Sequence, residues 1–338
     1  MKGRDGNIEL LRLVLMYLIC MIHAVGYVDA RWCHWLTNIS FVGVIGFVLI
    51  SGFYGIRFSL LKVIKLEGVA IGCAMTVIAA AAVLDALGYS SVLPPFGLAW
   101  GREALALFKG YWFVHAYVVM MCLAPLVERV FADVSSPDGR RAAVLACVPF
   151  LVMVYGWSFA MLIPIVQNFV PRTAGLVPFS GITLFAAYLV GRLYRVFDWD
   201  NLLKGRWIIP AAAVGGFVAS LWYGLFARYN SPFLLVFAVG LFWSFRRLSI
   251  PLGVVTPISW LTPSVLSVYL LHCNSYGFRL FSCLEGWMRG DVGISGDYLV
   301  FLVLATLAFA GGFLLDVPRR ILAWGMRKVY GREFKNVG

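Results

Sequence analysis

Apolar segments of about 20 residues recur from one end of the chain to the other, and each is long enough to cross a bilayer as a helix. Hydrophobic residues make up 62% of the 338 residues and charged residues 13%, whereas about a quarter of the residues of a soluble domain are charged. No polar stretch is long enough to fold separately. The sequence therefore predicts an all-α polytopic membrane protein with a single domain over residues 1–338.

Ten segments are expected to span the membrane, which would place both termini on the same side. The first segment is too long for the apolar core of a cleaved signal peptide and contains an arginine, so we expect it to remain in the protein. The longest outer loop, 88–109, is apolar and contains Pro, Gly and Trp, and we expect a re-entrant or interfacial segment there. The ten expected spans are roughly 8–28, 38–57, 66–87, 110–131, 142–163, 176–195, 207–226, 232–246, 260–283 and 298–318.

The basic residues are distributed unevenly between alternate loops. With the N-terminus inside, twenty of the 28 Lys and Arg fall on the cytoplasmic side, including those of a basic C-terminal tail at 319–338, and six fall outside. This asymmetry agrees with an even number of spans and predicts two cytoplasmic termini. It also accounts for the net charge of +12 without a nucleic-acid partner, because the basic residues are spread over many loops that face lipid of the inner leaflet.

The first apolar segment carries three ionisable residues, Glu9, Arg12 and His23. A charge at the centre of a bilayer costs about 3 kcal/mol or more, so each needs a partner or a function there. At 3.6 residues per turn, Arg12 and His23 lie within roughly 20° of each other on one helix face and about 16 Å apart along the axis. Glu9 precedes Arg12 by three positions, which allows an ion pair. A snorkelling arginine and a packing histidine are the alternative interpretation.

Two further histidines are expected inside the membrane. His115 is near the outer end of the fourth span and His272 lies within the ninth, so both are expected in the central to outer half, with His23. Arg279 follows His272 by two turns. A histidine can act as a general base near neutral pH. A zinc site is not expected, because no two of these histidines share a span and no acidic ligand lies at matching depth.

The seven cysteines are scattered, mostly within apolar segments, and no CxxC pair occurs. This pattern is typical of packing residues and predicts neither a disulfide framework nor a metal site.

Two short motifs accompany these ionisable residues. SGFYG at 51–55 ends the second span near the depth of Arg12, where Ser51 and Gly52 would let a ligand or another helix approach closely. YWFVHAYVVMMCLAPL at 111–126 places aromatic residues at the interface, and Trp112, Phe113 and Tyr117 are candidates for lining a sugar or acyl site. Small-residue helix packing and an ordinary aromatic belt are the alternatives.

Together these segments resemble the integral-membrane acyltransferase family 3, which includes bacterial polysaccharide O-acetyltransferases. The most specific feature is an arginine followed by ten residues and a histidine in the first span. Cys273 departs from the family pattern, in which an acidic or polar residue is expected after the histidine, and His115 is not expected from that pattern either. The resemblance covers most of the chain, in NIELLRLVLMYLICMIH, SGFYG, YWFVHAYVVMMCLAPL, YNSPFLLVFAVGLF and VLSVYLLHCNSYGFR.

The resemblance implies a multi-pass O-acyltransferase of the bacterial cytoplasmic membrane. Acetyl-CoA or another acyl-CoA is the expected co-substrate, no bound cofactor is expected, and the acceptor is a hydroxyl of a cell-surface or lipid-linked glycan. His23 is the expected general base or transient acyl carrier, with Glu9 as the second catalytic residue. Donor binding is expected at Arg12, Ser51, Gly52 and Arg57, and acceptor binding or a second site at Trp112, His115, Tyr117, His272 and Arg279.

A transporter or flippase of a glycan or lipid-linked sugar is the main alternative, because broken helices and ionisable residues in the membrane would serve either function. Two observations favour the enzyme. No internal repeat is visible, and Arg12 and His23 are directed toward opposite sides of the membrane instead of gathering at its midplane. A non-catalytic scaffold would give no account of these two residues.

Overall fold

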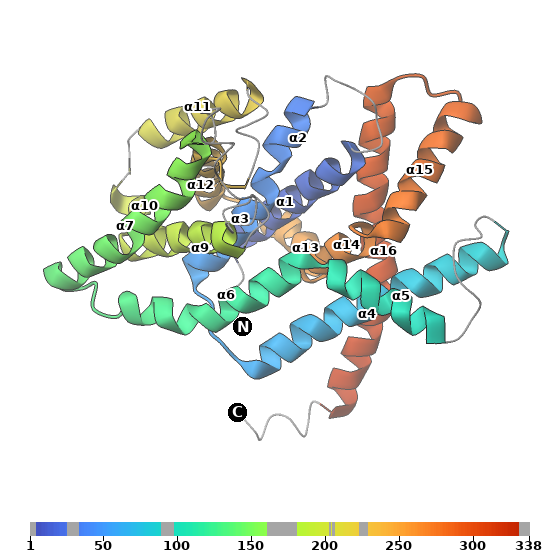
Figure 1. Cartoon of the computed structure of the whole chain (residues 1–338), viewed down its shortest axis with the longest axis horizontal. Coiled ribbons are helices and arrows are strands. Elements are labelled where there is room, and N and C mark those ends of the chain that lie inside the picture. Colours follow the sequence, from blue (N-terminus) through green and yellow to red (C-terminus); the bar gives the residue numbers. More distant parts are fainter. Residues whose placement is uncertain are drawn as a thin grey trace.

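Every regular element in the described part of the chain is a helix, which confirms the predicted all-α fold. The helices form one bundle in which segments far apart in the sequence lie side by side (Figure 1). The computed structural model describes residues 5–25, 34–88, 98–160, 181–202, 204, 207–222 and 229–330.

The described residues include seven segments that are long and apolar enough to cross a membrane, and two shorter apolar helices. The prediction of a multi-pass membrane protein is therefore confirmed, while the number of ten spans and the cytoplasmic location of both termini remain predictions. Four expected spans, 8–28, 142–163, 176–195 and 207–226, extend into residues outside the described ranges. The seven segments are Gly6–Val25, Leu36–Tyr54, Leu60–Ala86, Trp112–Val130, Pro137–Gly156, Gly253–His272 and Asp297–Leu322, and the shorter helices are Ile209–Ala219 and Pro232–Arg246.

Helix α1 (Gly6–Val25) runs through the middle of the bundle (Figure 1). It contacts α3 (Val42–Tyr54), α14 (Val265–His272) and α16 (Asp297–Tyr330). Half of the apolar part of α1 is buried, as is 67% of the segment that includes α3, whereas α16 buries only 33%. Helices that are apolar on all sides are typical of such central positions. The polar groups of α1 can therefore face cavities inside the protein.

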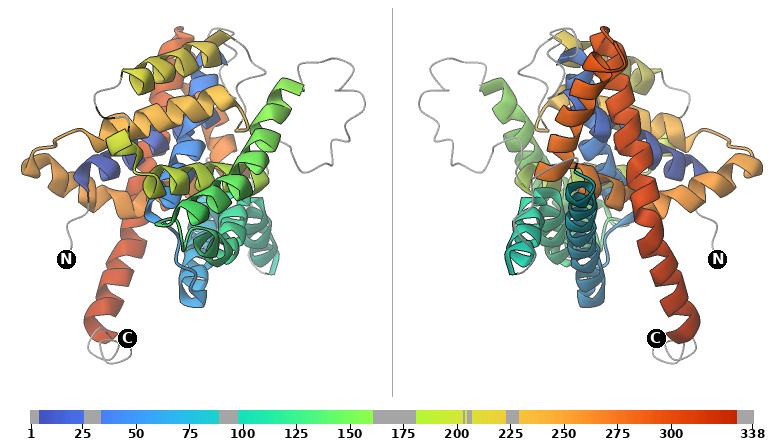
Figure 2. Two further views of the ribbon diagram at one scale, coloured as in Figure 1. Left: turned by 90° about the vertical axis from the view of Figure 1, so that its left-hand side faces the viewer. Right: turned by 90° about the vertical axis from the view of Figure 1, so that its right-hand side faces the viewer.

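The remaining helices surround this centre. Figure 1 shows α4, α5 and α6 along one edge of the bundle and α11 with α12 at another. Helix α15 lies against α16, and the last turns of α16 extend beyond the other helices (Figure 2). The bounds are α2 His34–Ser40, α4 Leu60–Ala86, α5 Leu98–Gly110, α6 Trp112–Val130, α7 Pro137–Ala160, α9 Gly181–Val196, α10 Trp199–Leu202, α11 Ile208–Trp222, α12 Pro232–Arg246, α13 Leu252–Leu261, the 3₁₀ turn η2 Thr262–Ser264 and α15 Ser275–Gly290.

Helices α3 and α9 cross at glycines. A Cβ on Gly52 would lie 3.0 Å from the Cα of Gly191, and a Cβ on Gly191 would lie 2.9 Å from the backbone nitrogen of Phe53. Small residues at a crossing let two backbones approach closely. Gly52 therefore packs against α9, and its expected role in donor binding has no support. Gly55 then ends α3 with a φ of +74°, a conformation that residues with a Cβ rarely adopt.

The expected ninth span, 260–283, is not one helix. The segment here that is long and apolar enough to cross a membrane is Gly253–His272, which consists of α13, the η2 turn and α14. Cys273 and Asn274 then separate α14 from α15. The prediction was wrong because the apolar pattern continues across this break, while the Asn that caps the new helix lies inside the apolar run. Arg279 therefore lies on a different helix from the histidine that ends α14.

Two other expected boundaries differ from the structure. The outer loop 88–109 contains helix α5 from residue 98 onward, and residues 89–97 lie outside the described ranges. Helix α16 continues into the expected tail 319–338 as far as Tyr330. There the guanidinium of Arg319 donates two hydrogen bonds to the carboxylate of Asp316, which is 1% exposed. The cytoplasmic location of the tail remains a prediction.

Replacing Gly191 with Ala should destabilise the fold, because the added methyl group would meet the backbone of α3. We expect a loss of about 1–3 kcal/mol in the free energy of unfolding, the usual cost of forcing extra atoms into packed regions. Thermal unfolding of the purified protein in one detergent would measure the loss as a lower midpoint temperature. Gly72→Ala in α4 is the matched control, since nothing lies within 4 Å of a Cβ there. Equal midpoints for the two variants would contradict the close crossing.

Candidate active site

Two histidines from distant parts of the chain meet at the ends of their helices. His23 lies in the last turn of α1, and His272 is the last residue of α14. The Nδ1 of His23 lies 2.9 Å from the Nε2 of His272, and the ring centroids are 5.0 Å apart. His272 is 5% exposed, whereas His23 is half-buried. The two imidazoles therefore lie at the same depth in the bundle, with His23 the more accessible of the two.

The hydrogen bonds determine where the protons lie in this pair. The carbonyl oxygen of Val268, 2.5 Å from Nδ1 of His272, can only accept, so that nitrogen carries the proton. With both rings neutral, Nε2 of His272 accepts and Nδ1 of His23 donates. The lone pair of His23 is then on its Nε2. The Sγ of Cys273 lies 3.3 Å from that nitrogen and is its hydrogen-bond donor.

The break between α14 and α15 brings Cys273 into contact with α1. The backbone of Cys273 leaves the helical conformation, with φ −85° and ψ 65°. Asn274 stabilises both helix ends. Its Nδ2 donates to the carbonyls of Leu270 and Leu271 at 3.0 Å each, and its Oδ1 accepts from two backbone N–H groups in the first turn of α15. Because these groups would otherwise lack partners within a helix, one asparagine makes the break stable.

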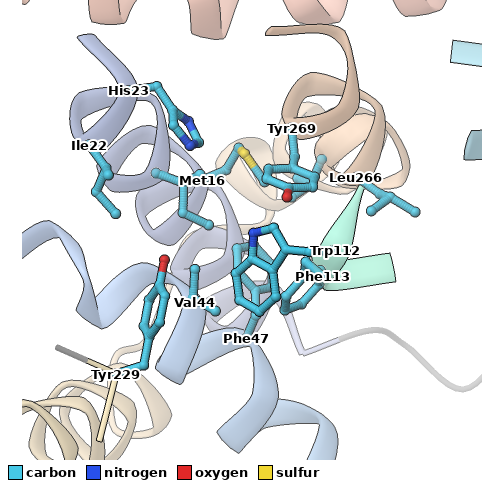
Figure 3. Close-up of a pocket in the computed structure, with 12 residues that line it drawn as sticks. Met16, Ile22, His23, Val44, Phe47, Trp112, Phe113, Tyr229, Leu266 and Tyr269 are labelled. Carbon is cyan, nitrogen blue, oxygen red and sulfur yellow. The ribbon is translucent and has the colours of Figure 1, made fainter. Parts of the chain in front are cut away.

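An apolar cavity of about 100 Å³ lies beside His23. Figure 3 shows the imidazole of His23 and the ring of Tyr269 on one side of this space, and Trp112, Phe47 and Tyr229 on the other. Its lining is almost wholly aliphatic and aromatic. The volume is small, so the cavity can take a short chemical group but not a whole sugar or a long chain.

A second cavity, of about 530 Å³, lies beside Arg12 near the start of α1. Its polar residues include Asp5, Glu9 and Tyr54, and the hydroxyl of Tyr54 donates to the carboxylate of Asp5 at 2.6 Å. The Nη1 of Arg12 lies 2.5 Å from Oε1 of Glu9, which confirms the predicted ion pair. Among the described residues that line this cavity, Arg12 is the sole cation. An anionic ligand there would depend on this guanidinium.

The two cavities share a wall formed by Phe47, Val265 and Leu266. Arg12 and His23 therefore face adjoining cavities from one helix, about 16 Å apart along its axis. A ligand anchored beside Arg12 would have to pass this wall to reach the imidazole.

The structure separates Glu9 from His23. The two residues are fourteen positions apart on one helix, which is about 21 Å along the axis. Glu9 is 3% exposed and its carboxylate binds Arg12, so the structure places it with the guanidinium and not beside His23. Arg57 is exposed after the end of α3 and is not among the residues that line the Arg12 cavity, so its expected donor contact has no support either.

Ser51 and Tyr117 form hydrogen bonds beside Phe47, one of the residues that line both cavities. The hydroxyl of Ser51 donates to the carbonyl of Phe47 at 3.0 Å and accepts from the hydroxyl of Tyr117 at 3.2 Å. These bonds connect α6 to the part of α3 that carries Phe47. Trp112, on the same helix as Tyr117, lines the His23 cavity directly.

His115 and Arg279 lie elsewhere, although the sequence predicts them at a second site. The Nε2 of His115 is 3.0 Å from the carbonyl oxygen of Phe108, and its Nδ1 is 3.8 Å from the carboxylate of Glu67. Arg279 lines a separate apolar cavity of about 510 Å³ between α4, α15 and α16. The position of a residue along a span predicts its depth in the membrane but not the direction of its side chain around the helix axis. The expected second site therefore contributes His272 and Trp112 to the cluster around His23, and not these two residues.

Two other arginines near helix ends have carboxylate partners. Arg192 binds Glu128 at 2.7 Å, and Arg246 binds Asp200 at 2.7 Å. These ion pairs connect α9 to α6 and α12 to α10. Arg12 also has a carboxylate partner, but 33% of its side chain is exposed beside the large cavity.

A metal centre is not indicated by the side chains of this region. Within the described ranges, no group of three or more His, Cys, Asp or Glu side chains is arranged to hold a metal ion. The two imidazoles and the thiol bond to one another and to the Val268 carbonyl instead.

This arrangement, an arginine-lined cavity and a histidine pair within a bundle of apolar helices, agrees with one known protein family. The family model described as an acyltransferase domain, acyltransferase 3, matches residues 5–317. The chain belongs to the acyltransferase 3 family. The match confirms the resemblance predicted from the sequence, and with the apolar helices it identifies a membrane acyltransferase. No curated protein and no solved structure matches the chain.

Three residues of this acyltransferase site are not predicted from the sequence. Tyr269 precedes His272 by three positions and so shares its helix face, a spacing that could have revealed it. Phe47 precedes Ser51 by four positions in the same way. Cys273 is noticeable in the sequence only as a departure from the family pattern. Its contact with His23 depends on the helix break, which the apolar pattern hides.

We expect His272→Ala to lower the rate of acyl transfer while the protein still inserts and folds. Without its acceptor, Nδ1 of His23 no longer retains the proton, and the lone pair on Nε2 is present in only part of the population. Removing the residue that orients a catalytic histidine can lower kcat by up to about 10⁴-fold. For this neutral pair we expect a loss of at least about tenfold, measured with purified protein.

His115→Ala provides the matched comparison, because this ring bonds to Phe108 and Glu67 outside the cluster. It should leave the rate unchanged. Equal losses for the two histidine variants would mean that the hydrogen bond to His23 has no special role.

Proposed function

We propose that this acyltransferase transfers an acyl group, most simply acetyl, from cytoplasmic acyl-CoA to a hydroxyl of a cell-surface or lipid-linked glycan at the bacterial cytoplasmic membrane. One observation carries the proposal. Arg12 and His23 lie on the same helix and face two cavities with a common wall. One cavity suits a large anionic donor, and the other holds a base beside a space for a short acyl group.

Arg12 is the proposed anchor for the phosphates of CoA. A guanidinium has five N–H donors and forms strong paired bonds with phosphate. Glu9 accepts from one of these N–H groups and orients the guanidinium, and the remaining N–H groups are available to the ligand. Asp5 and Glu9 add negative charge to the same cavity, so the affinity for an anion would depend strongly on the single arginine.

The narrow arm of CoA would pass the wall of Phe47, Val265 and Leu266 and place the thioester beside His23. The size of the cavity there supports acetyl over a long acyl chain as the transferred group. Its apolar lining would also exclude water, which otherwise competes with the acceptor hydroxyl for the acyl group.

His23 is the proposed general base. Its Nε2 carries the lone pair and would take the proton of the acceptor hydroxyl as the oxygen attacks the carbonyl carbon. The hydroxyl of Tyr269, a residue that lines the His23 cavity, would stabilise the oxyanion that forms on the thioester. Arg279 does not serve this role, since it lines a different cavity.

The acceptor glycan would approach from the side of the bundle opposite the donor. His23 lies at the end of α1 that is remote from the Arg12 cavity, and Trp112 and Tyr229 line the space around it (Figure 3). Because this cavity is too small for a whole sugar, only the acceptor hydroxyl and the atoms next to it would enter, beside the edges of these aromatic rings.

Arg12→Ala should raise the KM for the acyl-CoA donor by about 10–100-fold, the effect of losing a charged hydrogen bond of about 1.5–3 kcal/mol. Arg12→Lys should restore only part of the loss, because an ammonium cannot form the paired bonds. Donor titrations by calorimetry and steady-state kinetics would measure both variants. Arg141→Ala is the control, since its side chain is 81% exposed on α7. Unaltered donor binding in Arg12→Ala would remove this arginine from the donor site.

His23→Ala should abolish acyl transfer while the purified protein unfolds at the wild-type temperature. The surface glycans of strains with the wild type, the variant or no gene would be compared by mass spectrometry, and loss of one acyl mass would identify both the group and the acceptor. Near-wild-type transfer by the intact variant would falsify the role of His23. Uptake of a labelled saccharide into proteoliposomes, without donor turnover, would favour a transporter.

A further inference from the structure

The thiol of Cys273 lies within hydrogen-bond distance of the basic nitrogen of His23. Its Sγ is 3.3 Å from Nε2 of His23, the nitrogen that carries the lone pair. An acceptor hydroxyl that used this lone pair directly would first have to displace the sulfur. Cys273 is partly exposed, whereas Cys20, Cys73 and Cys147 are buried.

A nucleophile, a base in contact with it and a third group that orients the base are the parts of an activated nucleophile. All three are present here. Cys273 is the nucleophile, His23 is the base, and His272 orients that base because its own ring is held by the carbonyl of Val268. Of these three residues, His23 lines the apolar cavity, which provides room for a short acyl group beside the base.

We propose that Cys273 is a catalytic nucleophile that carries the acyl group as a thioester between the donor and the acceptor. This inference rests on the proposed transfer from acyl-CoA, and it identifies the residue that holds the acyl group after CoA leaves and before the acceptor reacts.

The first half of the reaction exchanges one thioester for another. The thiol proton of Cys273 moves to Nε2 of His23 while the sulfur attacks the carbonyl carbon of the donor. The bond between this carbon and the CoA sulfur then breaks, and the departing thiolate takes the proton from His23. S-acyl-Cys273 and free CoA thiol remain.

The second half transfers the group to the acceptor. Nε2 of His23 takes the proton of the glycan hydroxyl while its oxygen attacks the acyl carbon on Cys273. The carbon–sulfur bond breaks, and His23 returns the proton to the cysteine sulfur. The products are the glycan ester and the original thiol, so atoms and protons balance without another reactant.

A cysteine carrier also leaves the base available, which an acylated histidine would not. Nδ1 of His23 donates to His272, so Nε2 is the ring nitrogen able to accept either a proton or an acyl group. Acylation at Nε2 would consume the base that the acceptor hydroxyl needs. A thioester on Cys273 leaves Nε2 of His23 able to accept the proton of the acceptor hydroxyl. It also keeps the acyl group in a thioester, the same type of bond as in the donor.

The wild-type protein tests the proposal directly. Purified protein is mixed with acetyl-CoA without an acceptor, quenched in acid, digested and analysed by mass spectrometry. We expect one acetyl group on the peptide that contains Cys273, removed by neutral hydroxylamine, which cleaves thioesters. N-ethylmaleimide should inactivate the enzyme, and acetyl-CoA should protect it. Absence of the label, or a label on His23 instead, would overturn the proposal.

Variants separate a nucleophile from a residue that only positions His23. Cys273→Ala and Cys273→Ser should both lose the label and at least about 100-fold in transfer rate, since nucleophile-deficient enzymes lose most of their activity. The serine variant keeps a hydrogen-bond donor, so near-wild-type transfer by Cys273→Ser would show a positioning role and overturn the proposal. Cys122→Ser, at an exposed cysteine of α6, is the matched control and should keep both label and rate.

The two proposals fail in different ways. Full transfer by Cys273→Ala, with none by His23→Ala, would reject the acyl-cysteine and leave the acyltransferase function intact. A folded wild-type protein that neither hydrolyses acetyl-CoA nor transfers its acyl group would reject the proposed donor, and the acyl-cysteine with it.

Discussion

A chain of hydrogen bonds from a backbone carbonyl through two imidazoles is the interaction on which this site depends. The carbonyl of Val268 is held by packing, since α16 approaches this residue so closely that a Cβ on Gly312 would lie 2.9 Å from its Cα. A fixed acceptor sets the proton on His272, and His272 sets the proton on His23. The orientation of the basic nitrogen is therefore decided by a helix–helix contact and not by the imidazole alone.

In this acyltransferase, the charged cavity and the apolar cavity lie beside different parts of the same helix, α1. The cavity near Arg12 contains carboxylates and a guanidinium, whereas the cavity near His23 is small and almost wholly apolar. Electrostatic interactions are stronger where water is excluded, so a developing oxyanion gains more from a nearby hydroxyl in the second cavity than it would in the first. In the proposed mechanism, a long donor is held by its charges in the first cavity and reacts in the second, beyond a common wall of three apolar side chains.

Sequence periodicity predicted those features that depend on one helix. The shared face of Arg12 and His23 and the ion pair with Glu9 follow from helix geometry, and the ion pair is present as expected. Predictions that needed the neighbours of a helix were less successful. His115 was expected near the other histidines because of its depth, yet it faces α4 and α5. Gly52 was expected to let either a ligand or another helix approach closely, and only the structure shows that it packs against α9.

The sequence by itself determined that this chain crosses a membrane many times, that it resembles a known acyltransferase family, and that one helix carries an arginine and a histidine on the same side. Each of these properties depends on the order and type of residues along the chain, so it can be predicted without knowing how the helices pack. Only the tertiary structure decided which groups surround His23. The break at Cys273 and Asn274 lies within a continuous apolar run, and a residue 250 positions away reaches the imidazole only when two helix ends pack together. Contacts of this kind depend on the packing of several helices at once, and no local pattern encodes them.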